Sequence, residues 1–161
     1  MGYTTEFKGA LDFNKTVDDY TVDFVNKFAE IRHMKRDNHK IQKIFRDWER
    51  YCYKGSLGVE GEFFIGGTDD RKEPDKSVID QNTPSKNCPG LWCQWIIRDN
   101  QLVWDGGEKF YKYTEWLRYL IENFFAPSGY ILNGRIEFQG EDVSDRGWID
   151  VVDNIVTMVN L

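Results

Sequence analysis

The chain has little of what marks a membrane, disulfide-stapled or cofactor-dependent protein. No run of about 18 apolar residues is present, so we expect no membrane-spanning helix. Three cysteines, Cys52, Cys88 and Cys93, are an odd number without CxxC spacing, which disfavours a disulfide framework and a zinc site. Walker loops, dinucleotide fingerprints and nucleophile elbows are also lacking. We therefore expect no metal, no cofactor and a reducing cytoplasmic environment.

What the chain does have is many aromatic residues and an uneven charge. Aromatic residues make up 16% and hydrophobic residues 40% of its 161 residues, which argues against disorder. The formal net charge of -6 disfavours wrapping of nucleic acid by the whole chain. Between Arg32 and Lys54, however, eight basic residues stand against three acidic ones. The length predicts a single domain, residues 1–161.

Residues 91–104 predict a β-hairpin. Residues 91–98 are rich in aromatic and β-branched side chains, and Asp99-Asn100 is typical of a two-residue turn before a return strand. Apolar side chains alternate onto both faces of this hairpin. We therefore expect it to be central in a sheet and covered on both sides.

An amphipathic helix is predicted to follow the hairpin directly. Asp105 stands where an N-cap belongs, and Glu108 three residues later completes the spacing of a capping box. Apolar residues then recur at helical steps, namely Phe110, Tyr113, Leu117, Leu120, Ile121 and Phe124. Pro127 is expected to end the helix.

The remaining patterns predict two further helices, one capped by Thr16 and one running from Asn38 to Cys52. The polar segment of residues 66–89 is expected to be a mobile loop without an element of its own. Strands are predicted at residues 4–13, 59–65, 130–138, 148–152 and 155–159. The expected fold class is α+β, a mainly antiparallel sheet with helices packed on one face and a C-terminal β-meander.

Four basic residues form the first candidate binding site. Lys40, Lys43, Arg46 and Arg50 recur at steps of three and four, so a helix would gather them on one face. Such a face can contact the phosphate groups of a nucleotide or a nucleic acid. The alternative is a solvated helix face, which is what most charge runs are.

The hairpin region holds the second candidate site. Trp92, Trp104 and Tyr111 can form an aromatic wall on which a base stacks. Lys109 lies within WDGGE, where a helix N-terminus can hold an anion. The alternatives are that the aromatic residues belong to the core and that the acidic residues of WDGGE are only caps.

Acidic residues near the C-terminus form a third candidate, comprising Glu137, Glu141, Asp142, Asp145 and Asp150. Two such carboxylates can perform acid–base work on a bound substrate. Turns ordinarily gather Asp, Gly and Ser, however, so local structure explains these residues equally.

The sequence contains the short segments MGYTTEF, LWCQW, WDGGEKFY, GYILNG and QGED. Together they resemble a family of small uncharacterised proteins of bacteria, phages and prophages. The resemblance covers both ends and the part after Leu91, roughly two-thirds of the chain. It implies a mobile-element origin and action in the cytoplasm of a bacterial host, and it carries over no catalytic residue.

These observations favour a non-enzymatic binding protein of phage origin. It would capture a host protein or a nucleotide-like small molecule and thereby antagonise an antiviral defence. One alternative is a nucleic-acid-binding accessory protein that uses residues 32–54. Another is a small nucleotide or sugar hydrolase that uses the acidic turn residues. The oligomeric state stays open, a homo-oligomer included.

Overall fold

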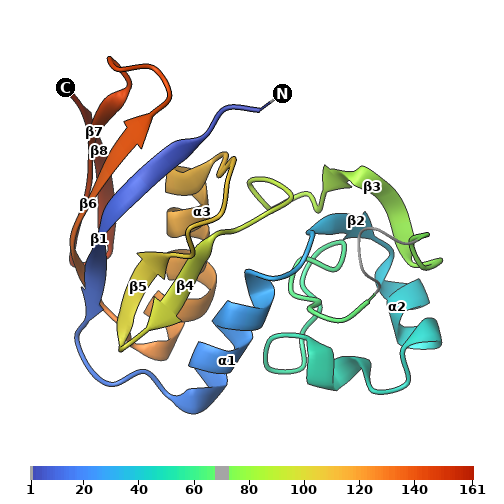
Figure 1. Cartoon of the computed structure of the whole chain (residues 1–161). Helices are drawn as coiled ribbons and strands as arrows, with labels where there is room; N and C mark the ends of the chain where they lie inside the picture. The colour runs from blue at the N-terminus through green and yellow to red at the C-terminus, as the bar shows by residue number, and fades with distance from the viewer. Residues whose placement is uncertain (1, 68–72) are drawn as a thin grey trace. The chain divides into compact units, whose positions relative to one another are not determined.

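The computed structural model describes residues 2–67 and 73–161. Their contacts divide the chain into two compact units (Figure 1). The first, here called the sheet unit, comprises Met1–Ala29 and Cys93–Leu161. The second, here called the insert unit, comprises Glu30–Trp92.

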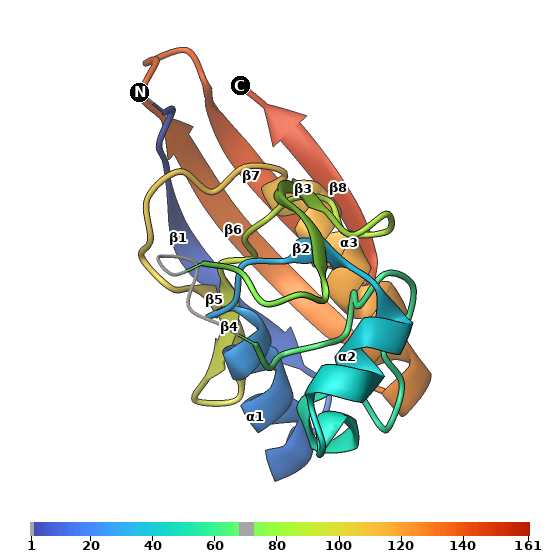
Figure 2. The same ribbon diagram turned by 90° about the vertical axis from the view of Figure 1, so that its right-hand side faces the viewer.

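The sheet unit is built on one six-stranded sheet in which every neighbouring pair is antiparallel. In spatial order its strands are β4 (Trp95–Arg98), β5 (Gln101–Trp104), β1 (Thr5–Phe13), β6 (Leu132–Gly140), β7 (Arg146–Val152) and β8 (Ile155–Asn160). The last three follow one another along the chain and lie side by side (Figure 2). The predicted α+β fold and its C-terminal β-meander are therefore confirmed.

Two helices of the sheet unit lie on the same side of this sheet. Helix α1 (Asp19–Phe28) is capped by Asp18, which accepts a hydrogen bond from the Thr21 N–H at 2.7 Å, and not by Thr16. Helix α3 (Tyr113–Leu120) continues into a π-helical turn (Ile121–Phe125) and a 3-10 turn. The predicted apolar stripe of α3 faces the core, with Leu117, Leu120 and Phe124 fully buried.

Aromatic side chains meet edge to face in the core of the sheet unit. The Phe7 ring centroid lies 5.3 Å from that of Trp95, 5.9 Å from Phe110 and 4.8 Å from Tyr113. Edge-to-face contacts suit the ring quadrupoles and stabilise beyond simple burial. This cluster explains why a unit with short helices has a well-defined interior.

The predicted capping box is wrong, because α3 begins at Tyr113. The backbone has positive φ at Gly106, Lys109 and Lys112, and right-handed helix is excluded at such residues. Phe110, 2% exposed, anchors the loop by packing 5.1 Å from Trp95. Burial of this ring therefore overrides the local helix-start signal.

The hairpin turn is confirmed, but its predicted central position is wrong. Asp99 and Asn100 both have positive φ, as a type I′ turn requires. Strand β4 nevertheless lies at the edge of the sheet, and Ile96 is only half-buried. The apolar side chains on both faces of the hairpin therefore indicated that each face is partly covered. They did not indicate that the hairpin lies between other strands.

The insert unit differs from its predicted elements. It contains β2 (Met34–Arg36), α2 (Asn38–Ile44), a 3-10 turn (Trp48–Tyr51) and β3 (Val78–Pro84). Helix α2 starts after the cap Asp37 and stops at Phe45, whose backbone is extended. One helix from Asn38 to Cys52 is therefore wrong.

Turns replace the strand predicted at residues 59–65, since Gly58, Glu60 and Gly61 all have positive φ. Strand β3 lies inside the segment of residues 66–89, which was expected to have no element. Part of that predicted loop, residues 68–72, lies outside the described residues.

A small apolar cluster and a buried ionic group stabilise the insert unit. The cluster consists of Ile41, Cys52, Leu57 and Phe64, with Phe45 and Trp48 packed against it. Arg36 is 3% exposed, and its guanidinium donates to Asp75 Oδ2 at 3.0 Å and Ser77 Oγ at 2.6 Å. Such polar groups need partners inside a protein, and here they have them.

Candidate functional site

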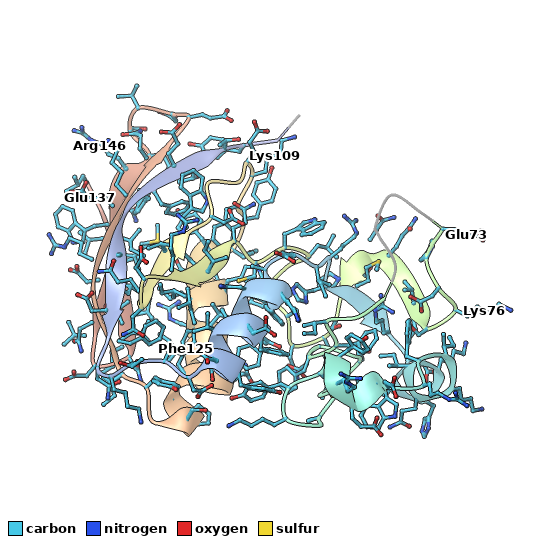
Figure 3. The ribbon with its side chains drawn as sticks, turned by 60° about the horizontal axis from the view of Figure 1, so that its bottom comes forward. Glu73, Lys76, Lys109, Phe125, Glu137 and Arg146 are labelled. Atoms are coloured by element: carbon cyan, nitrogen blue, oxygen red, sulfur yellow. The ribbon has the colours of Figure 1, made fainter. Side chains whose placement is uncertain are left out.

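The candidate site is the face of the six-stranded sheet that α1 and α3 do not cover. Along β1 and β6 buried and exposed residues alternate, so one set of side chains points to the helices and the other away. Figure 3 shows Glu137 and Arg146 on the side of the sheet opposite Phe125. We call this outward set of side chains the open face.

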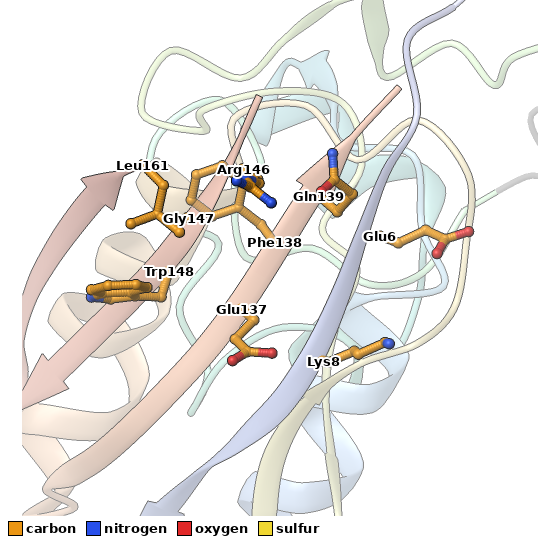
Figure 4. A pocket seen from close by; sticks show the side chains of 9 residues that line it. All are labelled: Glu6, Lys8, Glu137, Phe138, Gln139, Arg146, Gly147, Trp148 and Leu161. Atoms are coloured by element: carbon orange, nitrogen blue, oxygen red, sulfur yellow. The ribbon is translucent and has the colours of Figure 1, made fainter. Parts of the chain in front are cut away.

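A shallow depression of about 360 Å³ lies on the open face (Figure 4). Strand register places its side chains in two rows across β1, β6 and β7. The rows are Lys8, Glu137 and Trp148, and then Glu6, Gln139 and Arg146. Each row therefore combines a base and an acid or amide, so the depression has no dominant sign of charge.

Trp148 is held against a charged neighbour. The Arg135 guanidinium carbon lies 4.3 Å from the centroid of the Trp148 ring, a cation–π contact. The same guanidinium forms a two-pronged hydrogen bond to Asp150, with distances of 2.6 Å and 2.9 Å. These bonds lower the pKa of the Asp150 carboxyl. The arrangement restricts the motion of the ring, which is half-buried on the open face.

The depression is lined by charged, amide, aromatic and aliphatic residues. None of the described residues that line it is a cysteine, serine or histidine, and its two carboxylates lie beside a lysine and an amide. In the part of the chain that the structure describes, no three His, Cys, Asp or Glu side chains are grouped as a metal site.

The acidic turn between β6 and β7 ties down the start of the chain. Glu141 Oε1 accepts a hydrogen bond from the Thr4 N–H at 2.7 Å, and Asp145 Oδ2 accepts one from the Tyr3 hydroxyl at 2.7 Å. The Ser144 N–H lowers the pKa of Asp142, which favours its ionised form and disfavours a role as general acid. The turn therefore has a clear structural use.

The four predicted basic residues do not share one helix. Lys40 and Lys43 lie in α2, Arg46 follows its end, and Arg50 lies in the 3-10 turn. All four are exposed. Ile44, which was expected to face the core, is 44% exposed. The basic segment is thus accessible, but its charges are spread over separate elements.

The proposed aromatic wall is divided between the two units, since Trp92 belongs to the insert unit while Trp104 and Tyr111 belong to the sheet unit. Trp104 packs 5.4 Å from Phe7 and donates its indole N–H to Gln94 Oε1 at 3.0 Å. The Tyr111 hydroxyl accepts a hydrogen bond from the Tyr3 N–H.

Lys109 is exposed in the loop before α3, four residues ahead of the helix, so no helix N-terminus adjoins it. Asp105 Oδ1 instead accepts a hydrogen bond from the Gly107 N–H at 2.7 Å, which closes a turn. The anion site predicted at WDGGE therefore lacks its helix.

Sequence reasoning missed the cluster around Trp148. Part of the information was in the sequence, because Lys8, Glu137 and Trp148 each lie in a predicted strand, where alternate side chains share one face. Which strands are neighbours could not be read from those patterns. Only the pairing of β1 with β6, and of β6 with β7, brings these side chains into one row.

Comparison with known proteins finds no matching family model, curated relative or solved structure. Among the described residues, no helix is long and apolar enough to cross a membrane. The fold is α+β, and the outward residues of β6 are exposed on the open face of the sheet.

Proposed function

We propose that this chain is a non-enzymatic binding protein that captures another protein on the open face of its sheet. The observation that carries the proposal is the depression around Trp148, where an anchored aromatic ring is surrounded by both signs of charge. Aromatic and arginine side chains dominate the binding energy of many protein interfaces. Arg135 and Trp148 offer both at one place.

A protein suits this surface better than a nucleotide-like small molecule. Phosphate groups placed near Lys8 or Arg146 would also meet Glu6 and Glu137, which repel them. A protein surface can match such a mixed pattern with its own alternating charges. The resemblance to phage and prophage proteins supports a bacterial host protein as the partner, and antagonism of an antiviral defence as the purpose.

Capture from a bacterial lysate tests this proposal. The tagged chain is compared with a face variant, Glu137→Lys with Trp148→Ala, and with a control that reverses Lys40, Lys43, Arg46 and Arg50 to Glu. Native mass spectrometry then reports whether a protein or a small molecule is retained. We expect a protein that the wild type and control retain and the face variant loses. A partner retained by the face variant and lost by the control would refute the proposal.

A second candidate function is nucleic-acid binding by the basic segment of residues 32–54, because its four candidate residues are exposed. Binding through phosphate contacts weakens steeply as salt rises. A mixed-charge protein interface is less sensitive to salt. Titration with a DNA or RNA duplex at two salt concentrations therefore separates this function from the first.

A further inference from the structure

The two edges of the six-stranded sheet are treated differently by the fold. At the β4 edge, the Asn26 side chain of α1 donates to the Ile97 carbonyl at 3.0 Å and accepts from the Ile97 N–H at 2.8 Å. This amide therefore occupies the place of a neighbouring strand. Strand β4 is also only four residues long and ends in Arg98. Such features protect an edge from pairing with other strands.

The β8 edge is less protected: Arg118 donates to one of its outward carbonyls, that of Val156, at 3.1 Å, but the strand is longer than β4. In the described parts of the chain, no strand pairs with the side of β8 that faces away from β7. Its sequence, IVTMVN, contains no charge and no proline. A regular uncharged edge strand is a template for another strand.

The main-chain groups that β8 offers follow from its ladder with β7. The Leu161 N–H donates to the Arg146 carbonyl across this ladder at 2.9 Å. Alternate residues of an antiparallel strand point their N–H and C=O groups to opposite sides. Val156, Met158 and Asn160 therefore direct theirs away from β7. A bond from Arg118 to the Val156 carbonyl confirms this direction.

We infer that β8 pairs with β8 of a second copy of this chain, in an antiparallel arrangement with a two-fold axis at Met158. In that register the outward groups of Val156 meet those of Asn160, and Met158 meets itself. The Val156 carbonyl then exchanges its bond from Arg118 for one from the Asn160 N–H of the second copy. The two sheets then form one continuous twelve-stranded sheet, since each copy contributes six strands. Such isologous pairing is the commonest symmetry of homodimers.

Side chains on the open face support a second copy as the occupant. Ile155 of β8 is 70% exposed, and Leu161, which directly follows β8, is 65% exposed; both lie on the open face. Pairing about Met158 places Ile155 of each copy opposite Leu161 of the other. Val152, 63% exposed, lies beside Ile155 in the β7–β8 ladder and extends the apolar contact. No like charges oppose one another along the paired strands.

The other face of the sheet supports the same register. A hollow of about 220 Å³ lies beside β8, lined by residues that include Arg118, Glu122 and Val156. Pairing about Met158 brings Asn160 of the second copy opposite Val156, at the mouth of this hollow. The Asn160 amide can both donate and accept hydrogen bonds, so Arg118 and Glu122 are suitable partners.

Two six-residue strands bury little area, below the roughly 1,200 Å² of standard specific interfaces. We therefore expect a reversible dimer. Ile155 lies outside the depression around Trp148, whereas Leu161 lines it. Ile155→Lys therefore tests the dimer without altering the site of the proposed function. A failure of one proposal leaves the other standing.

Sedimentation of the full chain, from micromolar to near-millimolar concentration, tests the dimer. We expect the wild type to dimerise, and Ile155→Lys or Leu161→Glu alone to weaken dimerisation at least tenfold. Circular dichroism confirms that each variant folds, which is expected because both side chains are exposed. The double variant places opposite charges together across the two-fold axis, so it should dimerise more tightly than either single variant.

A wild type that stays monomeric throughout would overturn the inference, even if β8 binds the strand of a different protein. Dimerisation that neither single variant weakens would also overturn it, because another surface would then be the interface. A double variant weaker than both single variants would exclude the register about Met158. Rescue by the double variant supports both the surface and the register.

Discussion

The sheet unit and the insert unit are stabilised in different ways. In the sheet unit, strands in regular register enclose an interior of apolar and aromatic side chains, with Trp95 and Trp116 fully buried. In the insert unit, β2 and β3 pair with register shifts, and four buried apolar residues form the cluster. Arg36 and Glu62 are buried there as well. Polar contacts thus contribute a larger share of the stability of the insert unit than of the sheet unit.

This difference explains which parts of the fold could be predicted. Apolar periodicity indicates burial, so the strands of the sheet unit and the apolar stripe of α3 could be predicted from the sequence. A buried arginine gives no such periodicity, because an arginine in a sequence is expected to be exposed to solvent unless its partners are known. Asp75 and Ser77 lie about forty positions from Arg36, at separations of 39 and 41 residues. Their contact depends on tertiary structure alone.

The largest effect is expected in the aromatic core of the sheet unit. Trp95→Ala removes a fully buried ring and the hydrogen bond that its indole N–H donates to the Tyr113 carbonyl at 2.9 Å. We expect a loss of about 3 to 5 kcal/mol in the free energy of unfolding, measured by denaturant titration. Tyr111→Ala is the control, since Tyr111 is exposed. Equal effects of both variants would contradict the proposed core.

A slightly smaller effect is expected from the ionic group of the insert unit. Arg36→Met leaves Asp75 without its charged partner at a site where both side chains are largely buried. Breaking such a pair costs about 3 kcal/mol. The control is Asp23→Ala, which breaks the exposed pair with Lys27 and should cost under about 1 kcal/mol. A negligible effect of Arg36→Met would show that polar contacts do not hold the insert unit.

The same two variants test the sequence prediction of a single domain. If both units unfold together, Trp95→Ala and Arg36→Met lower the midpoint of one shared thermal transition. Two transitions, each shifted by only one of the variants, would mean that the units are independent domains. Differential scanning calorimetry distinguishes these outcomes.

A moderate effect is expected at alkaline pH in the sheet unit. Burial, with the nearby charges of Asp145 and Glu115, raises the pKa of Tyr113 from 10.0 to about 12. A pKa raised by folding stabilises the folded state below pH 10, and this contribution is lost as pH rises to about 12. Tyr113→Phe should flatten the stability curve in that window. An unchanged curve would mean that Tyr113 ionises freely.

The smallest effect is expected in the loop before α3. Partial desolvation of the Asp105 carboxyl, in a residue that is exposed overall, raises its pKa, so the ionised form is disfavoured in the folded state. Stability from this group is therefore greatest below its unfolded pKa and declines as pH rises through the folded pKa. Asp105→Asn keeps an oxygen for the Gly107 N–H and should be neutral or slightly stabilising at pH 7. Asp105→Ala loses that bond and should cost about 1 kcal/mol. The reverse order would contradict this account.

The candidate site was less predictable than the fold. Lys40, Lys43, Arg46 and Arg50 were grouped on the assumption of one continuous helix, which Phe45 interrupts. The open face was not grouped at all, because its residues come from strands that are distant in the sequence. Local sequence patterns predict which residues of a strand are exposed. Predicting a surface made by several strands also requires the order of those strands in the sheet.

The central claim is that the open face of the sheet unit binds the partner and the basic segment of the insert unit does not. Lysine acetylation of the captured complex, read by mass spectrometry, tests it directly. Lys8 marks the open face, Lys40 and Lys43 mark the basic segment, and all three are exposed in the chain alone. We predict that the complex protects Lys8 at least several-fold and leaves Lys40 and Lys43 as reactive as before. Protection of Lys40 and Lys43 with an unprotected Lys8 would contradict the claim.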